Sequence, residues 1–262
     1  MPRPKVCVLR TAGTNCDQET AFAFRKAGGL PDLVHINRLI QKEKRLADYQ
    51  ILAIPGGFTY GDDAGAGKIL ASELKHTLAD ELKLFLSKGK LIIGICNGFQ
   101  VLVKSGLLPG NGALRQEASL IINDSAKFEA RWVHLQSQGP GSVCVWARDL
   151  PEVIYLPVAH GEGKFFTAGA QVLERLHRNR QVVFKYCGPD GGPADYPDNP
   201  NGSQDDIAGI CDETGRILGL MPHPERHVDA FQHPRHASKG RGAGGEGILI
   251  FSNGVEYARK NI

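Results

Sequence analysis

The chain has 262 residues, of which 42% are hydrophobic and 23% charged, and its formal net charge is +3. This composition is typical of a globular protein with a substantial core, and the charge is too small to indicate a nucleic-acid-binding face. The chain contains no run of about 18 apolar residues, so we predict no membrane-spanning helix. Its six cysteines are scattered and form no CxxC motif, which argues against a disulfide framework and against a zinc ribbon. We therefore expect a reduced, cytoplasmic protein with one domain over residues 1–262.

Strand-like and helix-like patterns alternate over residues 1–110, which predicts a parallel sheet with helices on both faces. The expected strands cover residues 5–11, 33–39, 49–54 and 91–95. The expected helices cover residues 16–26, 67–86 and 97–104. Strand 91–95 has only apolar residues and glycine, as expected for a strand buried on both faces.

Shorter β-like runs follow in the second half of the chain. They cover residues 128–135, 141–146, 154–159, 181–186, 206–211 and 217–221. Residues 212–215 predict a hairpin turn between the last two runs. Residues 188–202 and 232–247 predict long loops, the second of them mobile, and a final helix is expected at 247–260. We predict a three-layer α/β fold with a mostly parallel central sheet, helices on both faces, and added β-hairpins in the second half.

Cys96 is the predicted nucleophile. It lies in GICNG (residues 94–98), between strand 91–95 and helix 97–104, which is the thiol version of a nucleophile elbow. Glycines two residues away on each side leave room for the neighbouring strand and helix at a strained turn. The turn sets the sulfur above the carboxyl end of the strand, at a helix N-terminus whose dipole favours the thiolate. We expect the other five cysteines to be buried structural residues.

A thiol nucleophile needs a general base and a group that orients this base. MPHPE (residues 221–225) supplies both, because each proline favours extended backbone at the preceding residue and alternate residues of an extended segment share a face. His223 is the predicted base and Glu225 its orienting carboxylate. His160, in PVAHGEG, is the rival base. A metal site is a weaker alternative, since the spacing of its candidate ligands matches no compact motif. These candidates are His223, His227, His233 and His236.

Attack on an amide carbonyl builds negative charge on oxygen, which preorganised backbone N–H groups stabilise. The elbow offers the N–H of Asn97. The glycine pair in IPGGF (residues 54–58) is the candidate for the second donor, because glycine lets the backbone turn its N–H outward; a simple tight turn explains this pair equally well. Residues 61–68 only partly match a phosphate-binding loop, since Asp62 replaces a required glycine, and we predict no nucleotide site of known type.

Stretches along nearly the whole chain resemble the class I glutamine amidotransferases, whose fold is flavodoxin-like. Within this family they are most similar to the glutaminase subunits of phosphoribosylformylglycinamidine synthases, which act in purine biosynthesis. PVAHGEG, and CNGFQ leading into GLLPG, narrow the resemblance to these subunits. The matching stretches are GTNCD (13–17), IPGGFTYGDD (54–63), GICNGFQVLVKSGLLPG (94–110), RWVHL (131–135), PVAHGEGKF (157–165) and NPNGSQDDIAGICDETGRILGLMPHPER (199–226).

The resemblance implies that the chain hydrolyses glutamine to glutamate and ammonia through Cys96, His223 and Glu225. It also implies oxyanion donors and residues that line the substrate pocket. The oxyanion donors are the backbones of Gly57 and Asn97, and the pocket residues are Gln100, His160, Gly161 and Glu162. Ammonia would pass to a separate synthase subunit, in some complexes with a small bridging subunit. ATP and magnesium are expected in that synthase subunit, and no cofactor, metal, nucleic acid or membrane is expected for this chain.

Residues 65–68 and 228–246 depart from the family pattern, which leaves the partner contacts open. Two other functions compete with the glutaminase hypothesis. Another thiol hydrolase on a similar sheet is disfavoured because an α/β-hydrolase places its acid before its histidine, whereas His223 precedes Glu225 here. A non-catalytic regulatory subunit is disfavoured by the intact set of Cys96, His223 and Glu225.

Overall fold

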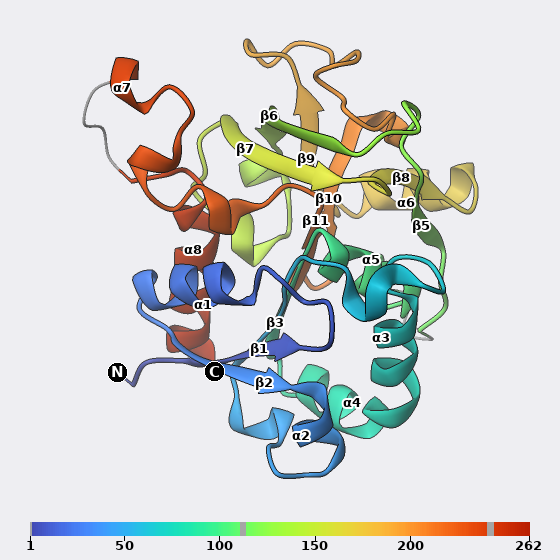
Figure 1. Cartoon of the computed structure of the whole chain (residues 1–262), viewed down its shortest axis with the longest axis vertical. Helices are drawn as coiled ribbons and strands as arrows, with labels where there is room; N and C mark the ends of the chain where they lie inside the picture. The colour runs from blue at the N-terminus through green and yellow to red at the C-terminus, as the bar shows by residue number, and fades with distance from the viewer. Residues whose placement is uncertain (1, 111–113, 240–243) are drawn as a thin grey trace.

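The computed structural model describes residues 2–110, 114–239 and 244–262. Within these ranges, nine strands lie side by side in one central sheet (Figure 1). In spatial order they are β2 (Leu30–His35), β1 (Lys5–Arg10), β3 (Ile51–Ile54), β4 (Leu91–Ile95), β11 (Ile217–Leu220), β10 (Ile207–Cys211), β9 (Val182–Cys187), β6 (Glu129–Ser137) and β7 (Val153–His160). No helix in the described ranges is long and apolar enough to cross a bilayer.

The sheet has a parallel part and an antiparallel part. The strands from β2 to β11 in that order all pair in parallel, and every residue of β3, β4 and β11 is buried, as apolar strands covered on both faces should be. From β11 to β7 the pairing is antiparallel. The α/β class with a parallel sheet through the first half, and the added β structure in the second, are confirmed.

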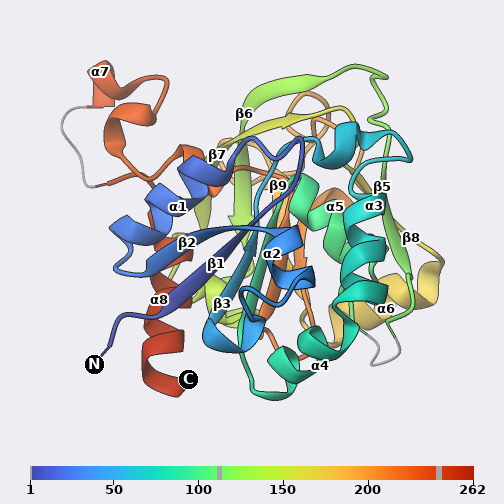
Figure 2. The same cartoon turned by 60° about the horizontal axis from the view of Figure 1, so that its bottom comes forward.

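Helices cover both faces of the parallel part (Figure 2). On one face lie α1 (Asp17–Lys26) and α8 (Ile248–Asn261), joined by an edge-to-face contact of Phe24 and Phe251 with ring centroids 5.0 Å apart. On the other lie α3 (Lys68–Ser72), α4 (Ala79–Ser87) and α5 (Asn97–Lys104). The helix α5 is buried from Asn97 through Val103, because it packs on β4 and β11 beneath the other helices. This burial fixes the start of α5, where the nucleophile was predicted.

Three predicted elements are wrong. The strand predicted at 33–39 ends at His35, because His35 Nδ1 accepts a hydrogen bond from the N–H of Asn37 and caps α2 (Ile36–Ile40). The strand predicted at 141–146 is replaced by turns and two 3₁₀ segments, η4 (Gly139–Gly141) and η5 (Val145–Ala147). The single helix predicted at 67–86 is divided into α3, a π-helical segment η3 (Glu73–Thr77), and α4.

Some elements carried no sequence signal strong enough to predict. The strands β5 (Ala118–Ile121) and β8 (Lys164–Thr167) pair in a separate antiparallel sheet, and α6 (Ala170–Arg178) buries only Leu176. The predicted loop at 232–247 contains the short helix α7 (His236–Lys239); residues 240–243 of that loop lie outside the described residues. The remaining short 3₁₀ segments are η1 (Leu46–Asp48), η2 (Thr59–Asp62), η6 (Gln204–Asp206), η7 (Pro224–Arg226) and η8 (Ala230–Gln232).

Candidate active site

Cys96 occupies a sharp turn between β4 and α5. Its backbone has φ 52° and ψ −107°, a conformation that a non-glycine residue adopts only where its surroundings hold it there. The N–H of Cys96 donates to the carbonyl of Leu220 on β11 over 2.8 Å, and the carbonyl of Cys96 accepts from Phe99 and Gln100 of α5. The turn is therefore fastened to the neighbouring strand on one side and to its own helix on the other.

The two glycines that flank the elbow are required by space. A Cβ on Gly98 would lie 1.9 Å from the carbonyl oxygen of Ile54, and one on Gly94 would lie 2.6 Å from the carbonyl oxygen of Gly98. Both contacts are with backbone, which cannot move aside as a flexible side chain does. The G-x-C-x-G spacing thus lets β3, β4 and α5 meet directly beneath the sulfur, as the sequence predicted.

His223 and Glu225 come to the same site because β11 lies beside β4. The strands are in parallel register, with Leu220 opposite Ile95, so the segment after β11 emerges next to Cys96. His223 Nδ1 lies 2.6 Å from Glu225 Oε1, and both side chains are almost fully buried. The predicted contact is present, but its backbone reason was wrong: Glu225 lies in the 3₁₀ turn Pro224–Arg226, not in an extended segment.

The surroundings of His223 favour its protonated form. Burial lowers the pKa of His223, but the negative charges of Glu225 and Cys96 outweigh this effect and hold the pKa well above its usual range. The other ring nitrogen, Nε2, is buried and makes no hydrogen bond within the described residues. A protonated imidazole beside a cysteine stabilises the thiolate, so His223 is placed to activate Cys96 and then to return a proton.

The two backbone N–H groups that the sequence predicted as oxyanion donors have no protein acceptor in the described residues. Neither Gly57 nor Asn97 donates its N–H to another group in the described part of the chain. Gly57 follows β3 with φ 142°, and a Cβ there would lie 2.8 Å from both the Asn15 nitrogen and the Gly13 oxygen. The first glycine of the pair, Gly56, has a different reason: its Cβ would lie 2.7 Å from His223 Cε1. Both glycines are therefore required by close packing and not only by a tight turn.

The side chain of Asn97 ties the elbow to the segment after β3. Its Oδ1 accepts from the Thr59 hydroxyl at 2.7 Å and from the Thr59 N–H at 3.2 Å. Its Nδ2 donates to Asp62 Oδ1 at 3.2 Å and to Gln100 Oε1 at 2.9 Å. Thr59 and Asp62 were not predicted as site residues, because neither belongs to a recognisable catalytic motif.

Gln100 and the segment around His160 form the opposite wall. Gln100 Nε2 donates to the carbonyl of Glu162 at 2.7 Å, so α5 is linked directly to the segment of Gly161 and Glu162. The Cys96 thiol faces the carbonyl of Ala159, at 3.7 Å. These residues therefore enclose the nucleophile, and Gln100 uses one donor and one acceptor of its amide on protein groups.

His160 has the contacts of a neutral structural histidine. Its Nδ1 lies 3.2 Å from Asn123 Oδ1, and its Nε2 lies 3.4 Å from Asn201 Nδ2, a pairing that requires one protonated and one bare nitrogen. Burial, with the nearby charge of His223, lowers the pKa of His160 to about 4. Since its ring nitrogens contact amides and not a carboxylate, the geometry favours His223 as the base.

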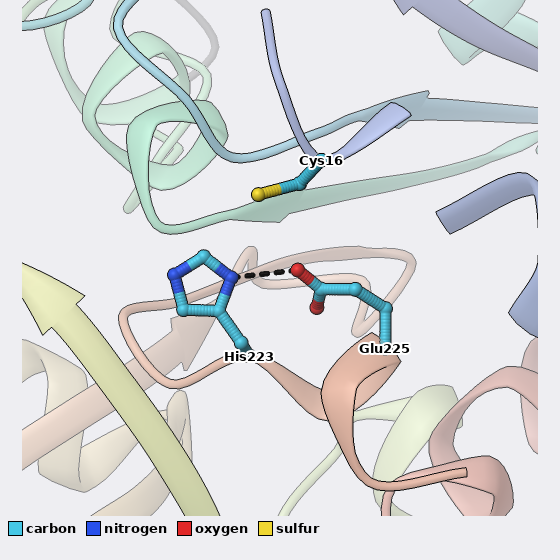
Figure 3. Close-up of side chains that lie close together, drawn as sticks. All are labelled: Cys16, His223 and Glu225. Carbon is cyan, nitrogen blue, oxygen red and sulfur yellow. Dashed lines mark hydrogen bonds and ion pairs between the residues drawn. The ribbon is translucent and has the colours of Figure 1, made fainter. Parts of the chain in front are cut away.

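Cys16 is a site residue that sequence reasoning treated as structural. Its sulfur accepts from Arg226 Nη2 at 3.0 Å and contacts Asn15 Oδ1 at 3.1 Å. In Figure 3 the Cys16 side chain lies on one side of the His223 ring, and the backbone of His223 lies on the other. Ligand atoms of Cys16, His223 and Glu225 lie within 4.8 Å of one another, the one metal-capable group found among the described residues. Of the four histidines considered for a metal, only His223 belongs to it.

This arrangement agrees with the relationship of the chain to known proteins. A family profile described as the CobB/CobQ-like glutamine amidotransferase domain matches residues 3–258. The chain belongs to this family.

Two relatives of this amidotransferase chain are similar over their full lengths, and both are named phosphoribosylformylglycinamidine synthase subunit PurQ. The protein of Dehalococcoides mccartyi is 49% identical, covering 99% of this chain and 100% of its own. That of Methanococcus maripaludis is 46% identical, covering 98% of each. Among solved structures, a chain of PurLQS from Thermotoga maritima superposes with a TM-score of 0.75 at 30% identity, covering 98% of this chain and 99% of that one.

Proposed function

We propose that this chain is the glutaminase subunit of a phosphoribosylformylglycinamidine synthase. It hydrolyses the side-chain amide of glutamine and supplies ammonia for the ATP-dependent conversion of formylglycinamide ribonucleotide to formylglycinamidine ribonucleotide in purine biosynthesis. The observation that carries the proposal is the strained Cys96 turn beside the buried His223–Glu225 pair. Full-length similarity to subunits of the same name supports the acceptor and the synthase partner.

The first half-reaction uses the ion pair of Cys96 and His223. The thiolate attacks Cδ of glutamine, and the N–H groups of Gly57 and Asn97 hold the resulting oxyanion. The imidazolium of His223 then donates its proton to the amide nitrogen. The C–N bond breaks, ammonia leaves, and a γ-glutamyl thioester remains on Cys96. Glu225 keeps the imidazole oriented through Nδ1 and stabilises its charged form.

The second half-reaction restores the enzyme. Neutral His223 takes a proton from water, whose oxygen attacks the thioester carbonyl. The C–S bond then breaks, glutamate leaves, and the thiolate–imidazolium pair of Cys96 and His223 is regenerated. Glutamine and water have become glutamate and ammonia, and this step consumes no cofactor. Gln100, His160, Gly161 and Glu162 are proposed to shape the wall that receives the glutamine backbone.

In the proposed assembly this chain forms a single domain over nearly its full length. It binds the synthase subunit and, in some complexes, a small bridging subunit. ATP and magnesium act in the synthase subunit, and the cytoplasm, where purine nucleotides are made, is the proposed location. Ammonia that escapes into water is mostly protonated and is then no longer a nucleophile. Direct passage from this chain to the synthase subunit would keep it neutral.

The test measures the hydrolysis of glutamine separately from the synthesis that consumes ammonia. The complex is reconstituted with the wild type, with Cys96→Ala, or with Cys7→Ala, the same change at a buried cysteine of β1. We expect Cys96→Ala to abolish glutamate release and glutamine-dependent synthesis while synthesis from added ammonia continues, and Cys7→Ala to retain both. Unchanged turnover of glutamine by Cys96→Ala would overturn the proposal, as would equal loss of the ammonia-dependent reaction.

A further inference from the structure

A basic cavity lies outside the site described above, between α3, the π-helical segment η3 and the end of α5. Its volume is about 460 Å³, within the range of small-molecule sites. The cationic residues of its lining are Lys68, Lys75 and Lys104, with His76 beside them. Ser72 and Gln116 add neutral polar groups, and no carboxylate lines it among the described residues. The space is a depression open to solvent, since Lys68, Ser72 and His76 are exposed; we call it the basic cavity.

The three lysines bring positive charge to the basic cavity without a carboxylate in direct contact, although the charges of Glu162 and Asp62 act on Lys104 from a distance. None of them forms an ion pair with a carboxylate in the described ranges. Lys75 Nζ donates to the carbonyl of Leu114 at 2.9 Å, and Lys104 Nζ to that of Ala66 at 2.6 Å. Each ammonium group has three protons, so each retains donors for a ligand. Burial lowers the pKa of Lys104; the charges of Glu162 and Asp62 partly oppose this effect, and the charge of Lys68 adds to it.

The backbone at the basic cavity is itself unusual. Lys75 and His76 lie in η3, the π-helical segment between α3 and α4. Such segments are rare and frequently lie at functional sites. Here Lys75 and His76 of η3 line the same space as Lys68 and Lys104. An ordinary continuous helix, as the sequence predicted, would not require this distortion.

A chain of contacts links the basic cavity to the proposed oxyanion donor. Lys104 Nζ holds the carbonyl of Ala66, and the next residue, Gly67, donates its N–H to Asp62 Oδ1 at 3.3 Å. The same oxygen of Asp62 accepts from Asn97 Nδ2 at 3.2 Å. Gly67 also packs tightly on α5, where a Cβ would lie 2.9 Å from the nitrogen of Val101. Residues 59–67 therefore bridge the two sites.

We propose that the basic cavity binds the phosphate group of a small phosphorylated ligand, and that its occupancy stabilises residues 59–67 and so the oxyanion site. Three ammonium groups match the two negative charges of a phosphate better than the single charge of a carboxylate, and lysine binds phosphate as a point charge. The phosphate comes from free inorganic phosphate or from a nucleotide, and the two sources are distinguished by experiment.

Binding is measured by isothermal titration calorimetry on the full chain at constant ionic strength, with inorganic phosphate, adenosine monophosphate and acetate as probes. We expect both phosphates to bind and acetate to bind at least about tenfold more weakly, and the tighter of the phosphates identifies the source. Loss of one charge-assisted hydrogen bond in Lys68→Gln or Lys75→Gln should weaken phosphate binding roughly tenfold. Lys83→Gln, at an exposed lysine of α4 outside the basic cavity, should leave it unchanged.

This binding measurement does not depend on the proposed glutaminase activity, so the two proposals fail separately. Absence of phosphate binding at millimolar concentration, or equal weakening by Lys83→Gln, would overturn the site. The link to catalysis is tested by glutamate release with and without saturating phosphate. We expect phosphate to raise kcat/KM about threefold in the wild type and not in the double variant Lys68→Gln/Lys75→Gln. An equal response in both proteins would refute the link.

Discussion

Replacing Glu225 by glutamine tests whether the carboxylate behind His223 supplies electrostatic stabilisation. The two side chains are buried and 2.6 Å apart at their nearest atoms. Taking about 4 Å between their charge centres and an effective dielectric constant of about 20, the attraction is about 4 kcal/mol. If the imidazolium form is needed in the transition state, Glu225→Gln should lower the rate of glutamate release by about 10³-fold, because a neutral amide of the same shape loses this attraction.

The assay is glutamate release by the reconstituted complex, with synthesis from added ammonia as the internal control. Glu213→Gln, the same change at an exposed residue after β10, should leave both rates unchanged. The carboxylate of Glu225 helps to raise the pKa of His223, so its removal should also shift the alkylation of Cys96 by iodoacetamide to higher pH. The reasoning is refuted if Glu225→Gln retains more than a tenth of the wild-type glutaminase rate with a correctly folded chain.

The remaining predictions concern the elbow, the rival histidine and the oxyanion segment. Gly98→Ala should destabilise the chain by about 2–3 kcal/mol in urea unfolding, because its Cβ would lie 1.9 Å from a backbone oxygen, whereas Gly169→Ala, with nothing within 4 Å, should be nearly neutral. The pKa of His160 is lowered to about 4, so the unfolded chain binds this proton more tightly. The resulting stability, roughly 3 kcal/mol, should be complete above about pH 6.5 and fall as the pH decreases toward 4. His160→Gln should remove this dependence, and a slope equal to that of wild type would contradict it. Thr59→Val, which removes the 2.7 Å bond to Asn97, should lower kcat about tenfold with little change in KM; an unchanged kcat would show that this bond does not position the oxyanion donor.

The predicted catalytic residues came from short motifs whose local geometry is largely independent of the rest of the chain. The elbow formed by GICNG requires only a strand, a helix and glycine at two positions, so the places of Cys96 and both glycines were predicted correctly. The contact of His223 with Glu225 was also predicted, although a 3₁₀ turn produces it. Their approach to Cys96 depends on the pairing of β4 with β11, which no local pattern contains; the family resemblance implied only that the three residues act together.

Residues that act across long sequence separations were missed. Cys16 lies beside His223 and contacts Arg226, both far along the chain, and only its membership of the GTNCD stretch marked it. The structural role of His160 depends on Asn123 and Asn201, one of which lies in a stretch predicted to be an irregular loop. The π-helical segment was hidden because its residues fit the apolar spacing of an ordinary helix. In each case the deciding contact is tertiary, and helix or strand periodicity does not report it.

The position of β11 between β4 and β10 has a consequence for synthesis of the protein. During translation β4 exists long before Ile217–Leu220 emerge, and until then one edge of this apolar strand offers unpaired backbone groups to any other chain. The strand that closes this edge also delivers the histidine. If His223 is the base, as proposed, a chain that ends before it retains the Cys96 thiol without this base, and its open strand edge favours aggregation.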